Sequence, residues 1–396
     1  MTSKFSVAFV LTVLSFGLTL TAAAQSDALR SLYQTSATIP TNVEGIFTYP
    51  APPEGFNALA ASDEELAAYG IPLRPDKAQD PDGYRQWTRL AMLMSNPRNR
   101  WYGELKPRRV HGSLAIASPA AAGTQVTPLT ATSIPSANWS GVVNTLGTKK
   151  YSPTKSFSWV WGKFAVPVPQ QAFAGYPNSG NICDGDTDQA SFWVGFGGFG
   201  GPNLPSLGNQ NNVAQTGVDI YASCGFGGTA IGAYAWVEWN PGPAAELFGV
   251  NPGDDISVSV QSLSSTTATF FIGDHTLQQT GSYEITAPTG ANCPKNPPCV
   301  NLGNEAEYIV ERPFGDSTPT GFYPLANYGW SFWDFSRAQA FTGVYYYPGG
   351  TNPATYDVSM TDDSGKNIIS VPYIDKGLQN LFVETEGCAG VNGCTP

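Results

Sequence analysis

Glu238 lies between Trp236 and Trp239 in the stretch AYAWVEWNPGP, residues 233–243. A carboxylate can act as a general base and then, once protonated, as the acid that returns the proton. Apolar rings beside it favour its neutral form. Side chains alternate between the faces of a strand, so Tyr234, Trp236 and Glu238 share one face. This glutamate is therefore either a solvated residue on an outer face or an acid in an aromatic cleft.

The scarcity of histidine limits the acid–base chemistry that the chain can use. The chain contains two histidines, His111 and His275, and only His275, in FIGDHTLQQ, falls in the acidic part of the sequence. A Ser-His-Asp or Cys-His enzyme would depend on it alone. A metal site built on histidine ligands is nearly excluded. If the protein is an enzyme, we expect carboxylates to carry its chemistry, with no metal and no cofactor.

Two neighbouring stretches place further polar and aromatic residues on one face. Gln215 and Asp219 share a face of the stretch 213–221, and Trp193 lies on one face of the stretch 191–196. The alternative is that these are ordinary solvent faces. If instead they line the concave side of one sheet, six side chains converge in an aromatic-walled groove: Glu238, Gln215, Asp219, Trp193, Trp236 and Tyr234.

Short alternating runs form the elements that must position these residues. From Asn138 onward the runs end in Gly, Pro or Asn, as in KSFSWVWGKFAVPVP, ASFWVGFGG, GAYAWVEW, DISVSVQSL and TATFFIG. Many strands without helices predict a sandwich or a barrel. About 260 residues in one β unit imply two large antiparallel sheets packed on each other. The expected fold class is therefore all-β.

The first residues have the pattern of a signal peptide. Lys4 precedes an apolar run over residues 5–20, which ends in small residues with an A-x-A site. This pattern predicts a signal peptide over 1–24, with cleavage after Ala24. No later stretch approaches the ~20 apolar residues that a membrane span needs. We therefore expect a secreted protein, extracellular or periplasmic, with no membrane association in its mature form.

Residues 25–132 are predicted to be a partly helical propeptide and linker that precede a domain over 133–396. Ser62 followed by Glu65 is a capping-box pattern that opens a short helix. The run DPDGYRQWTRLAMLMSNPR predicts a second helix, which ends at its Asn-Pro pair. The stretch 117–137 is rich in Ala, Thr, Ser and Pro and lacks periodicity, which is typical of a linker.

Charge divides the chain at the same place. Residues 1–135 carry 11 Lys and Arg against 10 Asp and Glu, whereas residues 136–396 carry 9 against 21. Such an acidic body argues against nucleic acid or anionic membranes as partners. Lys106-Pro107-Arg108-Arg109 is either a site for proteases or a plain solvated surface. We expect the basic residues of the propeptide to hold it over the acidic groove of a monomeric domain.

All the cysteines lie in the acidic part, and their number is even. An even count in an exported chain predicts disulfides. Proximity in sequence favours two pairs and leaves a third; the rival interpretation, a zinc site, lacks the C-x₂-C spacing. The favoured pairs are Cys293 with Cys299, Cys388 with Cys394, and Cys183 with Cys224.

Seven motifs, taken together and in order, carry a resemblance to a known family. They are NWSGVV (138–143), FAVPVP (164–169), FWVGFGG (192–198), AQTGVDIY (214–221), YAWVEWNP (234–241), AEYIVERP (306–313) and MTDDSGK (360–366). The chain from Asn138 to about Glu384 resembles the glutamic peptidases, or eqolisins, which are acid peptidases with a concanavalin-like sandwich. The resemblance does not extend over residues 25–130.

The resemblance implies a site and a substrate. The positions that match the catalytic dyad of the family are Gln215, in QTG, and Glu238, in WVEW. Trp139 and Trp193 match tryptophans of the substrate cleft, and Gly141 lies in the first motif. A secreted acid endopeptidase acting on polypeptides is therefore expected, with Glu238 as general base and Gln215 stabilising the oxyanion. Asp219 and Trp236 are expected to join Trp139, Trp193 and Gly141 in binding the substrate.

One position departs from the family, and two other functions compete with a peptidase. Gly197 stands where the family usually has an aspartate in W-V-G-I-D-G, which puts substrate preference in doubt. A jelly-roll glycosidase would need a second carboxyl near Glu238, and Asp219 is its one sequence-evident partner. A β-sandwich lectin is the non-enzymatic alternative, although DGDTD (184–188) lacks the distal Glu of a calcium loop.

Overall fold

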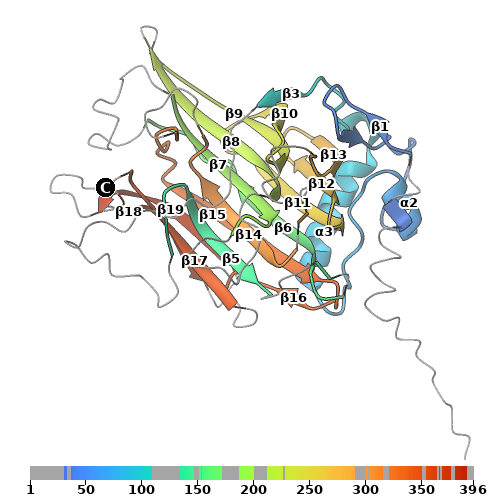
Figure 1. Cartoon of the computed structure of the whole chain (residues 1–396). Helices are drawn as coiled ribbons and strands as arrows, with labels where there is room; N and C mark the ends of the chain where they lie inside the picture. Colours follow the sequence, from blue (N-terminus) through green and yellow to red (C-terminus); the bar gives the residue numbers. More distant parts are fainter. Residues whose placement is uncertain are drawn as a thin grey trace, which may run out of the picture.

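The computed structural model consists of two large antiparallel sheets with helices on one outer face (Figure 1). It describes residues 31–33, 37–108, 134–146, 151–152, 154–171, 187–199, 212–225, 228–289, 300–301, 303–314, 321–349, 354–363, 365, 368–375 and 380–389. The predicted signal peptide, 1–24, and residues 109–133, which include most of the predicted linker at 117–137, lie outside these residues. Within them, no helix is both long and apolar enough to cross a membrane.

One sheet, called here the site sheet, contains the strands with the predicted catalytic residues. Its strands are antiparallel neighbours, except that β4 (Ile134–Ser136) joins β17 in parallel. The order is β17 (Ala354–Thr361), β5 (Trp139–Thr145), β14 (Glu305–Glu311), β7 (Thr187–Phe196), β8 (Val213–Gly225), β9 (Gly228–Asn240), β10 (Ala244–Val250) and β3 (Lys106–Arg108).

The other sheet, called here the back sheet, is also antiparallel. Its order is β18 (Ile368–Asp375), β19 (Asn380–Ala389), β15 (Trp330–Ala340), β6 (Phe157–Ala165), β11 (Asp255–Ser264), β12 (Thr267–Asp274), β13 (Gln279–Thr286), β2 (Ile46–Thr48) and β1 (Ile39–Pro40). The short β16 (Tyr345–Tyr346) pairs with β15, and pairing between β17 and β18 joins the two sheets. The all-β sandwich expected from the sequence is confirmed.

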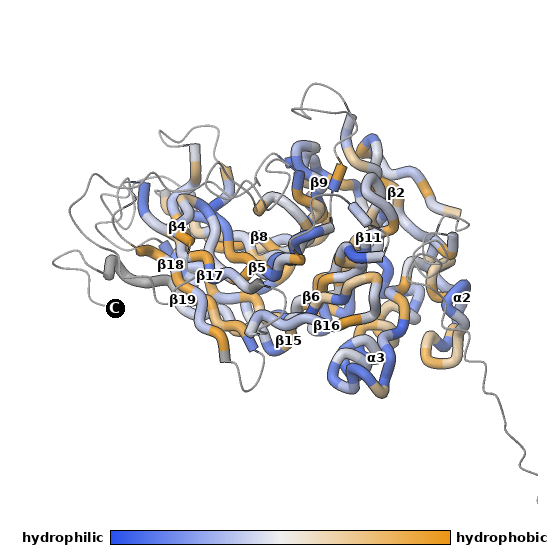
Figure 2. The backbone as a smooth tube through the Cα atoms, turned by 60° about the horizontal axis from the view of Figure 1, so that its bottom comes forward, coloured by the Kyte–Doolittle hydropathy of each residue, from blue (hydrophilic) through white to orange (hydrophobic). Residues whose placement is uncertain are grey.

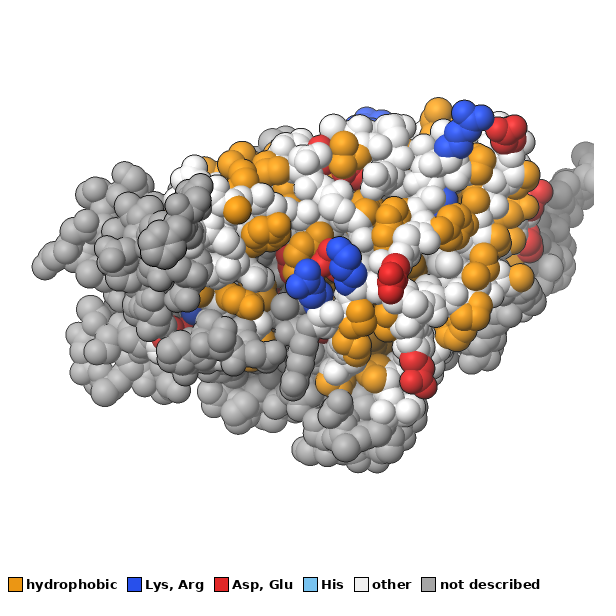
Figure 3. Space-filling model, turned by 90° about the horizontal axis from the view of Figure 1, so that it is seen from above, with side chains coloured by type: hydrophobic (Ala, Val, Ile, Leu, Met, Phe, Trp, Pro, Cys, Tyr) orange, Lys and Arg blue, Asp and Glu red, His pale blue; other side chains and the backbone are white. Residues whose placement is uncertain are grey.

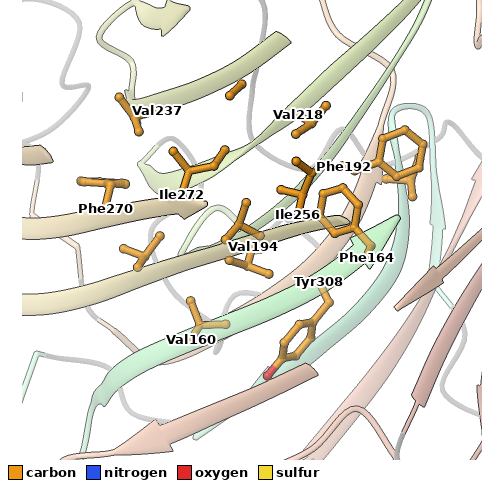
Figure 4. Close-up of a cluster of buried hydrophobic side chains, with 14 of the residues drawn as sticks. Val160, Phe164, Phe192, Val194, Val218, Val237, Ile256, Phe270, Ile272 and Tyr308 are labelled. Atoms are coloured by element: carbon orange, nitrogen blue, oxygen red, sulfur yellow. The ribbon is translucent and has the colours of Figure 1, made fainter. Parts of the chain in front are cut away.

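The main core lies between the sheets, where each presents the apolar half of its alternation (Figure 4). Val160 of β6 and Ile272 of β12 face Val194, Val218 and Val237 from β7, β8 and β9, and all are buried. Because successive side chains point to opposite faces, the remaining residues of these strands form two outer faces. One outer face belongs to the back sheet and the other to the site sheet.

The outer face of the back sheet is apolar and is covered by the N-terminal segment. Trp159, Trp161, Phe271 and Phe335 of this face form one buried cluster with residues of the segment, called here the back cluster. Two helices, α2 (Asp63–Ala68) and α3 (Pro81–Ser95), belong to the segment that supplies it. Figure 2 shows hydrophobic and hydrophilic residues side by side along α3, as expected for an amphipathic helix that covers a sheet.

The predicted helix ends are confirmed. Ser62 Oγ accepts from the backbone N–H of Glu65 at 3.2 Å, and the Glu65 carboxylate accepts from the Ser62 N–H at 2.8 Å. Asp80 caps α3 by accepting from the Gly83 N–H at 2.9 Å. The helix ends at Ser95, before the Asn-Pro pair that predicted its end.

After α3 the chain crosses from the back sheet to the site sheet. The 3₁₀ helix η1 (Pro97–Asn99) is followed by Trp101, whose N–H donates to the carbonyl of Thr280 in β13 at 2.9 Å. The chain then reaches β3, which pairs with β10 at the edge of the site sheet. The expectation that the N-terminal segment lies over the groove therefore applies to β3 alone, because the helices cover the opposite face of the sandwich.

The burial of Trp87 yields the first prediction. Trp87 in α3 is fully buried in the back cluster, and its indole N–H donates to the carbonyl of Pro72 at 2.7 Å. Trp87→Ala should lower the free energy of unfolding by about 3–5 kcal/mol, because it leaves a cavity and an unpaired carbonyl. Urea unfolding of the full chain measures this. The control is Met92→Ala on the exposed side of the same helix, where Met92 is 59% exposed and a change within about 0.5 kcal/mol is expected. Equal effects of the two substitutions would contradict the role given to α3.

Candidate active site

The pairing of β8 with β9 brings the two predicted catalytic side chains together. Gln215 and Glu238 are directly opposite each other in the ladder, so their side chains leave the sheet on the same face. The amide Nε2 of Gln215 donates to Oε2 of Glu238 at 2.7 Å. Strand alternation alone predicted a shared face, and the register makes the two residues direct neighbours.

The amide of Gln215 retains hydrogen-bonding capacity beyond this contact. A glutamine amide has two N–H donors, and the bond to Glu238 uses one of them. Its Oε1 is buried and has no hydrogen-bond partner among the described residues. The pair thus combines a carboxylate with a neutral donor that does not titrate, and the two are held in fixed relation by the ladder.

Aromatic and apolar side chains fill the outer face of the site sheet around the dyad. Trp139 and Trp193 meet edge to face, with ring centroids 5.0 Å apart. They belong to one buried cluster, called here the site cluster: Trp139, Val143, Trp193, Phe199, Val213, Trp236, Ile309 and Val358.

The dyad and the predicted tryptophans around it are buried in the full chain, and the predicted groove stays a prediction. Gln215 is 0% exposed and Glu238 is 1% exposed, and Trp139, Trp193 and Trp236 are 0% exposed. The predicted side chains do share one face, as alternation required. Three of its large rings, those of Trp139, Trp193 and Trp236, belong to the buried site cluster.

Glu311 on β14 is a member of this face that the sequence reasoning missed. Its Oε2 accepts from the indole N–H of Trp193 at 2.9 Å, and its Oε1 accepts from Nδ2 of Asn138 at 3.3 Å. The signal was present in the motif AEYIVERP, where alternation places Glu307, Ile309 and Glu311 on one face. Glu311 therefore holds the Trp193 ring in place from the neighbouring strand.

Asp219 is on the predicted face but not beside the dyad. It lies four residues from Gln215 along β8, about 13 Å at the usual rise of a strand. Its carboxylate accepts from Ser191 Oγ at 2.5 Å and from the Tyr234 hydroxyl at 2.7 Å, and it is fully buried. The structure thus joins Asp219 to Ser191 and Tyr234, in a network separate from Gln215 and Glu238.

Gly141 is required by close packing between β5 and β14. Its φ is +149°, and a Cβ at this position would lie 2.1 Å from the carbonyl oxygen of Tyr308. It pairs with Ile309 of β14, which in turn pairs with Trp193 of β7. The glycine therefore allows β5 to approach β14 beside the tryptophans, and the predicted contact of Gly141 with substrate stays a prediction.

The departure at Gly197 has a local structural reason. The residue adopts a φ of +87°, a left-handed conformation that favours glycine. A Cβ here would lie 2.5 Å from the carbonyl oxygen of Asn212 and 2.9 Å from Nδ2 of Asn301. Asn301 is itself fixed, since it donates to the carbonyl of Phe196 at 2.6 Å. This backbone therefore has no room for the aspartate of the family.

Two further buried carboxyls lie on β14 near this position. Glu307 pairs with Gly195 of β7, which pairs with Gln215 of β8, so Glu307 is in the same row as the dyad. Burial raises the pKa of Glu305 and that of Glu307 well above their usual range, and the charge of Glu305 adds to the shift at Glu307. Both carboxyls are therefore held in their neutral form well above the pH at which an exposed glutamate ionises.

The described residues include one disulfide-bonded cysteine and no assembled metal site. No group of three His, Cys, Asp or Glu side chains in the described part of the chain is arranged to hold a metal ion. Cys224, near the end of β8, is buried and disulfide-bonded. Cys183, Cys293, Cys299 and Cys394 lie outside the described residues, as does the side chain of Cys388. The predicted pairing of the cysteines stays a prediction.

Several solved structures are similar to the chain. Scytalido-glutamic peptidase bound to a transition state analog inhibitor matches with 18% identity and a TM-score of 0.45, over 63% of this chain and 98% of that one. SCP-B, described as a member of the eqolisin family and bound to the tripeptide Ala-Ile-His, matches with 17% identity and a TM-score of 0.44, with the same coverage. Aspergilloglutamic peptidase from Aspergillus niger matches with 21% identity and a TM-score of 0.36, over 50% of this chain and 99% of that one. No curated protein matches the chain significantly.

The family assignment rests on a match to a family model. The model of the Peptidase A4 family matches residues 137–375, which is more than half of the chain. The matched range begins just before β5 and ends with β18, so it contains every strand that carries a candidate site residue. The chain belongs to the Peptidase A4 family, the eqolisins, and is a glutamic endopeptidase.

Proposed function

We propose that the protein is a secreted, acid-active endopeptidase whose catalytic groups are Gln215 and Glu238. The observation that carries the proposal is the hydrogen bond of 2.7 Å between these two side chains, which are direct neighbours across β8 and β9. A carboxylate beside a neutral amide supplies both a base and an oxyanion donor. Neither function requires histidine, which the chain scarcely contains.

The reaction divides between the two residues as follows. Ionised Glu238 takes a proton from water as the water oxygen attacks the carbonyl carbon of the substrate, and the carbonyl electrons move onto the oxygen. An N–H of Gln215 stabilises this oxyanion, a contribution typically worth about 10²–10³ in rate. Protonated Glu238 then gives its proton to the leaving nitrogen as the carbonyl re-forms and the C–N bond breaks.

The position of Asp219 disfavours the glycosidase pair that the sequence suggested. A glycosidase pair needs carboxyls about 5–9.5 Å apart. Asp219, the expected partner, lies about 13 Å along the strand from the position opposite Glu238 and is engaged by Ser191 and Tyr234. The lectin alternative gains no specific support, because a lectin has no need of a carboxylate hydrogen-bonded to a neutral amide, as Glu238 is to Gln215.

We further propose that the full chain is a closed precursor and that cutting the linker activates it. The burial of Gln215 and Glu238 supports the first part, since a polypeptide cannot reach a dyad that is 0–1% exposed. The cut is expected within about 105–137, a range that includes the predicted linker, 117–137. The pattern of residues 1–24 supports export before this step.

The packing of the back cluster argues that the helical piece stays bound after this cut. Its residues share one cluster with Trp159, Trp161 and Phe271 of the back sheet, and β2 adds a strand to β13. Release would expose these large apolar side chains to water, at about 25 cal/mol per Å². The mature enzyme is then two chains joined without a covalent link through the linker.

The dyad is tested by substitution. Glu238→Gln should abolish hydrolysis of denatured casein because it removes the base, and Gln215→Ala should lower kcat/KM by about 10²–10³. Glu284→Gln is the matched control, since Glu284 on β13 of the back sheet also accepts a hydrogen bond, from Tyr49 at 3.1 Å, but is remote from the dyad. Circular dichroism and thermal melting confirm that each variant folds. A folded Glu238→Gln enzyme with substantial activity would refute the assignment.

The two-chain form is tested by cutting and sizing. The precursor should be nearly inert at neutral pH and should yield two pieces on a denaturing gel after acidification. Native size exclusion at pH 4 and at pH 7 should elute both pieces in one peak, because the apolar back cluster does not titrate in this range, although the ion pairs beside it, Asp80 with Arg337 and Arg89 with Asp255, weaken in acid. A separate peak for the N-terminal piece, with a stable remainder, would show that it is an ordinary releasable propeptide.

The buried carboxyls support function in acid. Burial raises the pKa of Asp274 to about 6, with Asp254 contributing, and burial also raises the pKa of Glu284 and that of Asp80. Glu305 and Glu307 are shifted in the same direction. A carboxyl with a raised folded-state pKa contributes stability that is fully present below its unfolded pKa, about 4, and is lost as the pH rises through the folded value.

The melting temperature should therefore be higher at pH 4 than at pH 8. His275 opposes this trend, because burial lowers its pKa to about 4 and its contribution is lost as the pH falls from about 6.5 towards that value. The pKa shift of this one histidine is outnumbered by the opposing pKa shifts of the five carboxyls. Asp274→Asn, which keeps the acceptor for the N–H groups of Thr276 and Leu277, should reduce the difference between the two pH values. Scanning calorimetry measures both, and a melting temperature that rises steadily from pH 4 to pH 8 would contradict the argument.

A further inference from the structure

Strand β3 occupies an edge of the site sheet that another polypeptide strand could take. β3 pairs antiparallel with β10, with Lys106 opposite Glu246 and Arg108 opposite Ala244. On its other side β10 pairs with β9, the strand of Glu238. Without β3 the edge of β10 would be unpaired, and an unpaired sheet edge can bind an extended peptide through main-chain hydrogen bonds.

In this contact the Glu246 side chain is buried, whereas the two cationic side chains of β3 are exposed. The Glu246 side chain is 10% exposed, whereas those of Lys106 and Arg108 are 67% and 48% exposed. Lys106 Nζ lies 3.0 Å from Oε1, and Arg108 donates to Oε2 from Nε at 2.9 Å and from Nη2 at 2.6 Å. On the face seen in Figure 3, basic side chains lie against an acidic one among apolar neighbours.

In the precursor the two cations compensate the charge of Glu246, which they also shield from water. When β3 leaves the edge both cations leave with it, and the Glu246 carboxylate becomes open to a cation of another molecule. The aromatic ring of Tyr234 adds to the same site, because the Arg108 guanidinium lies over it at 5.5 Å from the centroid. Such a ring attracts any cationic side chain bound next to Glu246.

The position of Glu246 places this site close to the dyad. Glu246 is directly opposite Trp236, which is two residues from Glu238 on β9 and on the same face. One strand spacing and two residues of rise separate the Cα atoms of Glu246 and Glu238 by about 8 Å. A substrate side chain at Glu246 therefore belongs to a residue within a few positions of the scissile bond.

We propose that Glu246, with the ring of Tyr234, is a subsite for a lysine or arginine side chain of the polypeptide substrate. In the precursor, Lys106 and Arg108 of β3 occupy the subsite. The inference rests on the proposed function and deepens it by naming a substrate preference. Cutting the linker frees one end of β3, so that a substrate strand with a basic residue can displace it.

Peptides that differ at one residue test the subsite. Lysine and norleucine have similar side-chain lengths but differ in charge, so each position around the scissile bond is filled with one or the other. At about pH 5, where an ordinary carboxyl is ionised, lysine at one position should raise kcat/KM about tenfold or more over norleucine. Glu246→Gln should bring this ratio close to one, and Glu284→Gln should leave it unchanged. Cleavage of all peptides with no preference for lysine would overturn the subsite.

A second variant predicts a change in the opposite direction. Lys106→Ala with Arg108→Ala removes the internal competitor, so the KM of the lysine peptide should fall, while that of the norleucine peptide should change much less. An unchanged KM for the lysine peptide would contradict the competition.

A binding measurement separates this inference from the proposed chemistry. The same peptides are titrated calorimetrically onto a chain with Glu238→Gln, Lys106→Ala and Arg108→Ala whose linker has been cut by an added protease, a measurement that needs no turnover. Tighter binding of the lysine peptide by about tenfold supports the subsite even if no peptide is hydrolysed by the parent enzyme, a result that would refute the dyad instead. Equal binding of the two peptides overturns the subsite whatever the activity.

Discussion

The register between β8 and β9 is the constraint on which the site depends. Gln215 and Glu238 form their hydrogen bond of 2.7 Å only because they are direct partners in this ladder. A shift of one residue would turn one of them into the core and bring an apolar side chain to the outer face. The register is held by Val218 and Val237, which occupy the opposite face of the same strands and pack into the main core. The main core thus positions the catalytic pair, because it fixes the opposite face of the two strands that carry the pair.

The same alternation gives the sandwich two outer faces with different tasks. The back sheet buries its outer tryptophans, Trp159 and Trp161, under the N-terminal helices. The site sheet buries its outer rings against one another, with Glu311 holding Trp193 by a hydrogen bond. After the helices the chain passes from the back sheet to the site sheet, where β3 pairs with β10 at the edge. One N-terminal segment can therefore act as a lasting support on one face and as a removable strand beside the dyad.

Buried carboxyls connect this architecture with an acidic working range. Glu305, Glu307 and Asp274 lie where burial raises the pKa of each, so each is more easily accommodated when protonated. The chain has 20 basic residues for 31 acidic ones, so ion pairs cannot compensate every carboxylate. Protonation removes the free-energy cost of burying the charge of such a carboxylate. Glu246 is instead paired, with a cation of β3 on each of its two oxygens, and its place beside the dyad is the basis of the proposed subsite.

The sequence by itself determined what depends on local pattern. This includes the all-β class, the capping box at Ser62, which residues share a face of each strand, and the match of the motifs to a family. These follow from periodicity and from short-range chemistry, which do not change with the rest of the fold. It did not determine the closed state of the site, the helices on the far face, or the roles of Glu311 and Glu246. Those depend on which strands become neighbours and in which register, and such contacts join residues more than a hundred positions apart, as between Glu246 and Arg108. Tertiary structure also decided that Gly197 must remain a glycine, because the atoms that exclude a side chain there come from Asn212 and Asn301.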